Sequence, residues 1–309
     1  MIKRTLCFSN PAYLSLKNAQ LVIRLPDAEM SEDTEHVRTE AVRTIPIEDV
    51  GFVVLDNKQI TITQGLMEAL LDNNCALITC DSSHLPVGLL LPLCGNTLQN
   101  ERFRSQIEAS LPLQKQLWQQ TISSKIRNQA AVLSEMRGID AANMLKWADD
   151  VRSGDADNKE ARAAVYYWQH AFPQVEGFLR DREGVPPNNL LNYGYAILRA
   201  VVARALVSSG LLPTFGMHHH NRYNAYCLAD DVMEPYRPYI DRLVMQLFDS
   251  GCDCAVLTKE LKTQLLQIPV LDVVINGKRS PLMNAVTTTT ASLQRCYSGE
   301  IRKIIYPEM

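Results

Sequence analysis

The spacing of apolar residues changes near residue 95, and this change restricts the folds that a chain of 309 residues can adopt. Upstream, short runs that alternate or carry β-branched side chains are separated by turn residues, a pattern typical of strands. These runs lie at 6–8, 13–16, 19–25, 43–47, 51–55, 60–63 and 75–80. Downstream, apolar residues recur at helical spacing over long segments. The sequence therefore predicts an α+β fold, with a small β-rich domain at 1–93 and a larger, mainly helical domain at 94–309.

The most apolar of the expected helices covers residues 190–206, where apolar side chains follow i, i+3, i+4 spacing. It follows a Pro-Pro pair, and Asn188 or Asn189 is the expected cap. Gly210 suits its end, because glycine readily adopts the left-handed conformation found there. The wide apolar face predicts a central, mostly buried helix.

Other segments carry weaker local signals. Residues 63–71 have helical spacing with Thr63 as the expected N-cap, and further helices are expected at about 230–247 and 257–267. Residues 27–40 are acidic and polar, so we expect a hairpin tip or an exposed loop there.

Composition and cysteine usage indicate an ordinary intracellular globular protein. Hydrophobic residues make up 46% and charged residues 21% of the chain. No apolar run approaches the ~18–20 residues that a membrane span requires, and the first residues resemble a strand more than a signal peptide. The eight cysteines include no CxxC, and Cys252 and Cys254 form the only close pair. We therefore expect reduced thiols, a cytoplasmic location and no membrane contact.

The net charge of −3 is unevenly distributed along the chain. Residues 1–95 hold 7 Lys/Arg against 12 Asp/Glu, whereas residues 96–309 hold 24 against 22. The acidic first part does not suggest a nucleic-acid surface. The second part is rich in arginine, so a local basic surface is possible there, because binding depends on where charges cluster.

A histidine run followed by acidic residues is the densest group of potential metal ligands. His218, His219 and His220 precede Asp231 and Glu234, and the i, i+3 spacing of these two acids places them on one face of a helix. Histidine combined with carboxylates suits Mg²⁺ or Mn²⁺ better than Zn²⁺. The alternative is a solvated loop, where histidine runs and paired acids are also common.

A further carboxylate, Glu160, lies in a helical pattern with small residues and three following aromatics, 166–168. This context favours an acid that faces inward. The alternative is a surface acid in the first helical turn, where the helix dipole stabilises negative charge.

Several segments, taken in order, resemble the CRISPR-adaptation integrase family, whose members insert new spacers into CRISPR arrays. In the helical part these segments are 192–199, 210–213, 216–219 and 228–238, and in the β-rich part they are 45–50, 53–55 and 60–63. The form of residues 219–224 is most similar to integrases that accompany single-protein RNA-guided effector nucleases. The resemblance covers most of the chain.

The resemblance implies a metal site for Mg²⁺ or Mn²⁺ with the ligands Glu160, His219 and Glu234. His218 is the alternative ligand, because a shift of one residue in the Gly-x-x-His pattern would select it. Asp231 matches a recurrent acid of the family, and its expected role is either a metal contact or the orientation of His219 or a basic residue.

The implied reaction is transesterification, in which the 3′-hydroxyls of a short DNA duplex attack phosphodiesters at a repeat boundary. The alternatives are a metal-dependent nuclease acting by hydrolysis and a non-catalytic DNA-binding scaffold. Candidate phosphate contacts, each of which can instead be a solvated helix-face charge, are Lys125, Arg127, Arg222, Arg237, Arg242, Lys278 and Arg279.

The resemblance also implies partners. These are double-stranded DNA, a second copy of the chain, a small ferredoxin-like adaptation subunit and, in some systems, the effector nuclease. The β-rich domain is the expected dimer interface, which accounts for an acidic domain in a DNA-binding protein.

Overall fold

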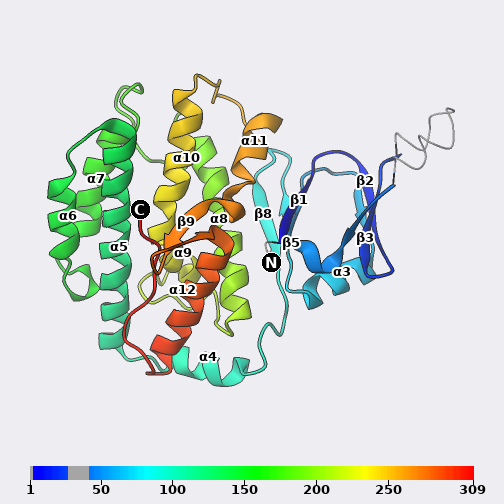
Figure 1. Ribbon diagram of the computed structural model, residues 1–309, viewed down its shortest axis with the longest axis horizontal. Helices are drawn as coiled ribbons and strands as arrows, with labels where there is room; N and C mark the ends of the chain where they lie inside the picture. The colour runs from blue at the N-terminus through cyan, green and yellow to red at the C-terminus, as the bar shows by residue number, and fades with distance from the viewer. Residues whose placement is uncertain (1–2, 27–41) are drawn as a thin grey trace. The chain divides into compact units, whose positions relative to one another are not determined.

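The computed structural model describes residues 3–26 and 42–309, and the chain divides into two compact units, residues 1–95 and 96–309. Strands dominate the first unit and helices the second, so the predicted α+β class is confirmed (Figure 1). The acidic segment expected to form a hairpin tip or loop, 27–40, lies outside the described residues.

Two four-stranded sheets form the first unit. One has the order β1 (Arg4–Phe8), β5 (Val50–Leu55), β7 (Ala76–Cys80) and β8 (Pro86–Leu90), with β8 antiparallel to the other three. The other has the order β4 (Val42–Pro46), β3 (Gln20–Arg24), β2 (Ala12–Lys17) and β6 (Ile60–Ile62), with β2 and β6 parallel. Among its described residues the unit also contains a 3₁₀ turn η1 (Ile47–Asp49) and helix α3 (Gln64–Asp72).

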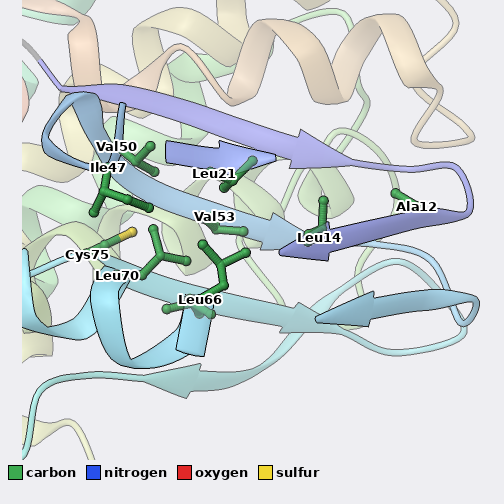
Figure 2. Close-up of a cluster of buried hydrophobic side chains, with 10 residues drawn as sticks. Ala12, Leu14, Leu21, Ile47, Val50, Val53, Leu66, Leu70 and Cys75 are labelled. Atoms are coloured by element: carbon green, nitrogen blue, oxygen red, sulfur yellow. The ribbon is translucent and has the colours of Figure 1, made fainter. Parts of the chain in front are cut away.

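The core of this unit is built from both sheets and α3 (Figure 2). Leu66 and Leu70 lie one helical turn apart on α3 and are fully buried, and Leu14, Leu21 and Val53 are buried with them at 0–1% exposure. The spacing of the leucines gives α3 one apolar face, and burial of such a side chain stabilises the fold by about 1.5–3 kcal/mol.

The second unit consists of nine α-helices within its described residues, three short 3₁₀ helices and one hairpin (Figure 1). The α-helices are α4 (Gln99–Ile107), α5 (Leu111–Arg137), α6 (Ala142–Asp149), α7 (Lys159–Ala171), α8 (Asn188–Ser208), α9 (Cys227–Met233), α10 (Arg237–Asp249), α11 (Lys259–Leu265) and α12 (Leu282–Tyr297). The remaining elements are η2 (Ser153–Asp155), η3 (Glu234–Tyr236), η4 (Ile268–Val270), β9 (Asp272–Ile275) and β10 (Lys278–Pro281).

Helix α5 is the longest element and contacts α6, α7, α10 and η3. It begins after Ser110, whose hydroxyl accepts a hydrogen bond from the backbone N–H of Leu113 at 3.4 Å, and Pro112 lies in its first turn. It ends at Gly138, which has a φ of 63°. These local signals set the length of the helix that carries two of the site residues described below.

Helix α8 is the central buried helix that the sequence predicts, but its start differs from the expectation. Pro187 is the cap residue and Asn188 is already helical, because the Asn188 amide instead donates to the carbonyls of Leu179 and Val185. Among the described residues α8 is the one helix long and apolar enough to cross a membrane by length and composition, and 78% of its apolar window is buried inside the fold. That burial is typical of a core helix.

The expected single helix at 230–247 is interrupted. Helix α9 ends at Met233, η3 follows, and α10 begins at Arg237. Pro235 and Pro238 lack the N–H groups that a continuous helix needs, and a proline ring clashes with the carbonyl one turn earlier. The break places Glu234 at the junction between two helices.

Candidate metal centre

The first carboxylate of the candidate site, Glu160, lies in the first turn of α7. The carboxylate of Asp155 in η2 accepts hydrogen bonds from the backbone N–H groups of Lys159 at 2.8 Å and Glu160 at 3.0 Å. Because Asp155 satisfies these unpaired donors, it determines where α7 begins. It thereby orients Glu160 toward α5.

The segment after α8 is held by a buried glutamine from α4. Gln106 is 4% exposed, and its amide nitrogen donates to the carbonyls of Leu212 at 3.0 Å and Phe215 at 2.9 Å. Its amide oxygen accepts from the N–H of Leu212 at 2.9 Å. These three bonds fix the backbone just before the histidine run.

Gly216 lies where no side chain fits. A Cβ at this position would lie 2.8 Å from the Asp231 Oδ2, 3.0 Å from the Cys227 Cβ, and closer still to the carbonyl oxygen of His219. The glycine therefore lets the backbone of the histidine run approach the start of α9.

Asp231 is the fully buried anchor of this backbone. Its Oδ2 accepts from the N–H groups of Met217 at 2.7 Å and His218 at 2.9 Å. Its Oδ1 lies 2.5 Å from the Nδ1 of His219 and also accepts from that residue's backbone N–H at 3.3 Å. The hydrogen bond to Asp231, opposed by burial, raises the pKa of His219. With the proton on Nδ1, the Nε2 of a neutral ring carries a free lone pair.

His218 has a different environment. Its ring stacks on that of Trp118 from α5, with the centroids 4.1 Å apart and the planes 3° from parallel. Burial, together with the neighbouring His219, lowers the pKa of His218. Its ring is therefore a packing partner of α5, and the carboxylate contact belongs to His219.

Lys125 of α5 joins the two glutamates. Its Nζ lies 2.6 Å from the Oε1 of Glu160 and 2.6 Å from the Oε2 of Glu234, although these acids come from different helices. Burial alone would lower the pKa of Lys125, but Glu234 and Glu160 outweigh it and raise that pKa. Burial would likewise raise the pKa of Glu234, but Arg237 and Lys125 lower it to about 2. The Glu234 carboxylate is therefore ionised at neutral pH.

Arg237 and a buried aspartate lie on the other side of Glu234. The Arg237 Nε is 2.9 Å from the Glu234 Oε1, and its guanidinium lies over the ring of Tyr195. Asp241 accepts hydrogen bonds from the hydroxyls of Tyr195 and Tyr167, the latter at 3.1 Å. Burial nevertheless raises the pKa of Asp241 to about 6.

The donor set fits a divalent ion. Glu160 and Glu234 already share one cationic group, and carboxylate oxygens are the preferred ligands of Mg²⁺ and Mn²⁺. The Oε2 of Glu234 is buried and has no hydrogen bond of good geometry, despite its distance to Lys125. In the part of the chain that the structure describes, no three His, Cys, Asp or Glu side chains are assembled as a ligand group. The Lys125 ammonium is the cation that the two carboxylates share in this structure.

The remaining acid of this segment and the candidate DNA contacts have the following environments. The acid that precedes Asp231, Asp230, pairs with Arg199 at 2.7 Å and accepts a hydrogen bond from Asn224. Four candidate DNA contacts form ion pairs with carboxylates: Lys125, Arg127, Arg237 and Arg242. The remaining three candidates, which are exposed, are Arg222, Lys278 and Arg279.

Sequence reasoning missed the local roles of Gln106, Trp118 and Asp155, and it placed Lys125 on a DNA surface. One signal was available for Lys125. It lies three residues after Ile122 and directly before Ile126, so it interrupts the buried apolar face of α5. A lysine at such a position needs a carboxylate partner, because burial of an unpaired charge is costly.

Comparisons with known proteins agree with this architecture. A casposase bound to an integration product superposes with a TM-score of 0.76 at 19% identity, covering 98% of this chain and 92% of that one. A Cas6-RT-Cas1–Cas2 complex contains a chain that superposes with a TM-score of 0.70 at 17% identity, over 97% of this chain and 35% of that one. At these identities the likeness establishes the fold.

Sequence comparisons establish the family. The family model described as CRISPR associated protein Cas1 matches residues 6–253. A CRISPR-associated endonuclease Cas1 from Neisseria meningitidis serogroup C (strain 8013) is 36% identical over 295 residues, which is 95% of this chain and 92% of that protein. The chain belongs to the Cas1 family, which confirms the resemblance drawn from the sequence.

Proposed function

We propose that this protein is a metal-dependent DNA integrase of CRISPR adaptation, which joins short DNA duplexes to a repeat boundary by 3′-hydroxyl transesterification. The observation that carries the proposal is the convergence of Glu160 and Glu234 on one cationic group. His219 lies on a backbone segment anchored by Asp231, within the electrostatic influence of Glu234 and Glu160. The names of similar proteins also support the proposal, since one is called an endonuclease and another a casposase bound to an integration product.

Glu160, Glu234 and the Nε2 of His219 would hold Mg²⁺ or Mn²⁺, which supplies Lewis-acid activation of a hydroxyl and charge neutralisation at phosphate. Asp231 keeps the proton on the Nδ1 of His219 and so leaves Nε2 available. Arg237 partly balances the negative charge of Glu234. The reaction exchanges one phosphodiester for another, so it needs no nucleotide cofactor.

DNA is the proposed substrate, in the form of a prespacer duplex and a CRISPR repeat. The exposed basic residues Arg222, Lys278 and Arg279 are the proposed phosphate contacts, because the other candidates already pair with carboxylates. We also propose a homodimer formed through the first unit, and a small ferredoxin-like partner of the kind named Cas2 in a similar complex. Contact with an effector nuclease and a cytoplasmic location complete the proposal.

A strand-transfer assay tests the function. A labelled duplex with free 3′-hydroxyls is mixed with a plasmid that carries a leader and a repeat, in the presence of the small partner and Mn²⁺, Mg²⁺ or EDTA. We expect metal-dependent transfer of label by the wild type and none by Glu160→Ala or Glu234→Gln. The matched control is Glu135→Ala, which removes an acid paired with Arg242 outside the site.

Each alternative has its own outcome. Label that is cut but never joined would favour a nuclease acting by hydrolysis. DNA binding without either product, and unchanged in Glu234→Gln, would favour a non-catalytic scaffold. Loss of folding in both site variants would mean that the glutamates are structural, and circular dichroism separates that case.

A further inference from the structure

Lys125 lies in an unusual position for a lysine. It is 8% exposed, in the middle of the longest helix, and its Nζ is 2.6 Å from carboxylate oxygens of both Glu160 and Glu234. One helix thus inserts a permanent cation between two acids that belong to two other elements. The contact bridges 35 residues to Glu160 and a longer separation to Glu234.

An ammonium and a divalent ion cannot share these oxygens. Mg²⁺ binds carboxylate oxygens at about 2.0–2.1 Å and demands near-octahedral geometry. A metal held by Glu160 and Glu234 would therefore lie next to the present position of the Lys125 Nζ. Like charges at such a separation in a buried site repel strongly.

We propose that Lys125 closes the metal site in the metal-free protein, and that its ammonium has to leave the space between Glu160 and Glu234 when a divalent ion binds. This inference rests on the metal site proposed above. It makes Lys125 a positioning residue that competes with the metal for the same two carboxylates.

A cavity beside the site can accept the displaced ammonium. It has a volume of about 190 Å³ and is bordered by Lys125, so it offers space next to that side chain. Arg180 and Arg237 also border this cavity, together with the ring of Tyr195. The Arg180 guanidinium bonds to the amide oxygens of Asn188 and Asn192 rather than to a carboxylate.

The displaced lysine would leave an excess of positive charge at this cavity. Lys125, Arg180 and Arg237 would then face one remaining carboxylate, that of Asp241, while the metal takes up the charge of Glu160 and Glu234. A further anion would balance this excess, and a DNA phosphate is the anion that the proposed reaction supplies. Metal and DNA binding should therefore strengthen each other. The metal displaces the lysine that then binds the phosphate, and the phosphate balances the positive charge that the displaced lysine brings to the cavity.

Mn²⁺ titration of the full chain without DNA tests the competition, with free Mn²⁺ followed by electron paramagnetic resonance. We expect the Kd for Mn²⁺ to fall by about tenfold or more in Lys125→Met and Lys125→Gln, a coupling within the usual range. Lys125→Arg keeps the cation and should bind Mn²⁺ no more tightly than the wild type. Lys115→Met, at an exposed position of the same helix, is the matched control and should be unchanged.

The neutral variants also leave the buried Glu234 and the half-buried Glu160 without the cation that they share, so Mn²⁺ should raise the Tm of these variants more than that of the wild type. This readout remains available if either variant folds only with Mn²⁺. Equal Mn²⁺ affinity and equal Mn²⁺-induced stabilisation in wild type and neutral variants would overturn the inference. Loss of Mn²⁺ binding in Glu234→Gln tests the metal site separately, so failure of the proposed function can be distinguished.

A DNA titration tests the second step. A short duplex with free 3′-hydroxyls should raise the Mn²⁺ affinity of the wild type, and this enhancement should be lost in Lys125→Met. A merely structural lysine would not couple the two ligands. The same enhancement in both proteins would overturn the role of the displaced ammonium in phosphate binding.

Discussion

Replacement of Asp231 by asparagine tests how the histidine is oriented. The carboxylate has no exposed surface, and its two oxygens face three backbone N–H groups and the Nδ1 of His219. An asparagine retains one oxygen. If that oxygen serves Met217 and His218, the new amide group faces the backbone N–H of His219, and two donors oppose each other.

The structure sets the expected size of the effect. Hydrogen bonds to a charged group contribute about 1.5–3 kcal/mol each, and an unsatisfied buried donor costs about 1–3 kcal/mol. We therefore expect Asp231→Asn to lower the free energy of unfolding by about 2–3 kcal/mol. The asparagine amide would also donate to Nδ1, which moves the ring proton to Nε2 and blocks that nitrogen as a ligand. Loss of such an orienting partner typically weakens metal binding by about 10–100-fold.

Three measurements check this prediction: urea unfolding, Mn²⁺ titration, and nitrogen NMR of the His219 ring to assign its tautomer. Asp230→Asn is the matched control, because Asp230 pairs with Arg199 and does not contact a histidine. The control should retain both Mn²⁺ affinity and the proton on Nδ1. An Asp231→Asn protein with wild-type Mn²⁺ affinity and an unchanged tautomer would refute the reasoning.

Four further predictions follow from single positions. Gly216→Ala should destabilise the protein by about 1–3 kcal/mol and weaken Mn²⁺ binding, because its Cβ overlaps the backbone of His219. Gly65→Ala, whose Cβ meets nothing within 4 Å in α3, should stabilise it by about 0.5–1 kcal/mol, and both are checked by urea unfolding. Gln106→Ala should cost about 1–3 kcal/mol in the same assay, because it removes three hydrogen bonds to the backbone of Leu212 and Phe215. The folded pKa of Asp241 is raised from 3.8 to about 6, so the folded state binds more protons between these values and stability should fall by about 3 kcal/mol as the pH rises through them. Asp241→Asn should remove this slope from a plot of Tm against pH, and an unchanged slope would assign it to another group.

Local patterns in the sequence determined which segments are strands and helices. The strands of the first unit and the buried helix α8 follow from alternation and from i, i+3, i+4 spacing, which depend on neighbours within a few residues. The ends of the helices were harder to predict from the sequence. Asn188 carries a typical capping side chain, but that side chain bonds to the preceding loop, and the prolines at η3 divide a segment whose apolar spacing looks continuous.

The sequence also supplied the candidate ligands Glu160, His219 and Glu234, because the order of short motifs resembles one family. It left His218 and His219 as alternatives. Only the tertiary structure shows that His218 stacks on Trp118 and that His219 contacts Asp231. These contacts join segments on separate helices and loops, so no local pattern reports them.

Lys125 shows most clearly which properties are visible in the sequence and which depend on the tertiary structure. Its place on the apolar face of α5 was visible in the sequence, but its two carboxylate partners were not. They are set by how α7 and η3 pack against α5, and that packing depends on burial of many distant side chains at once. The sequence by itself therefore determined the elements and the types of ligand, whereas tertiary packing decided which charges meet.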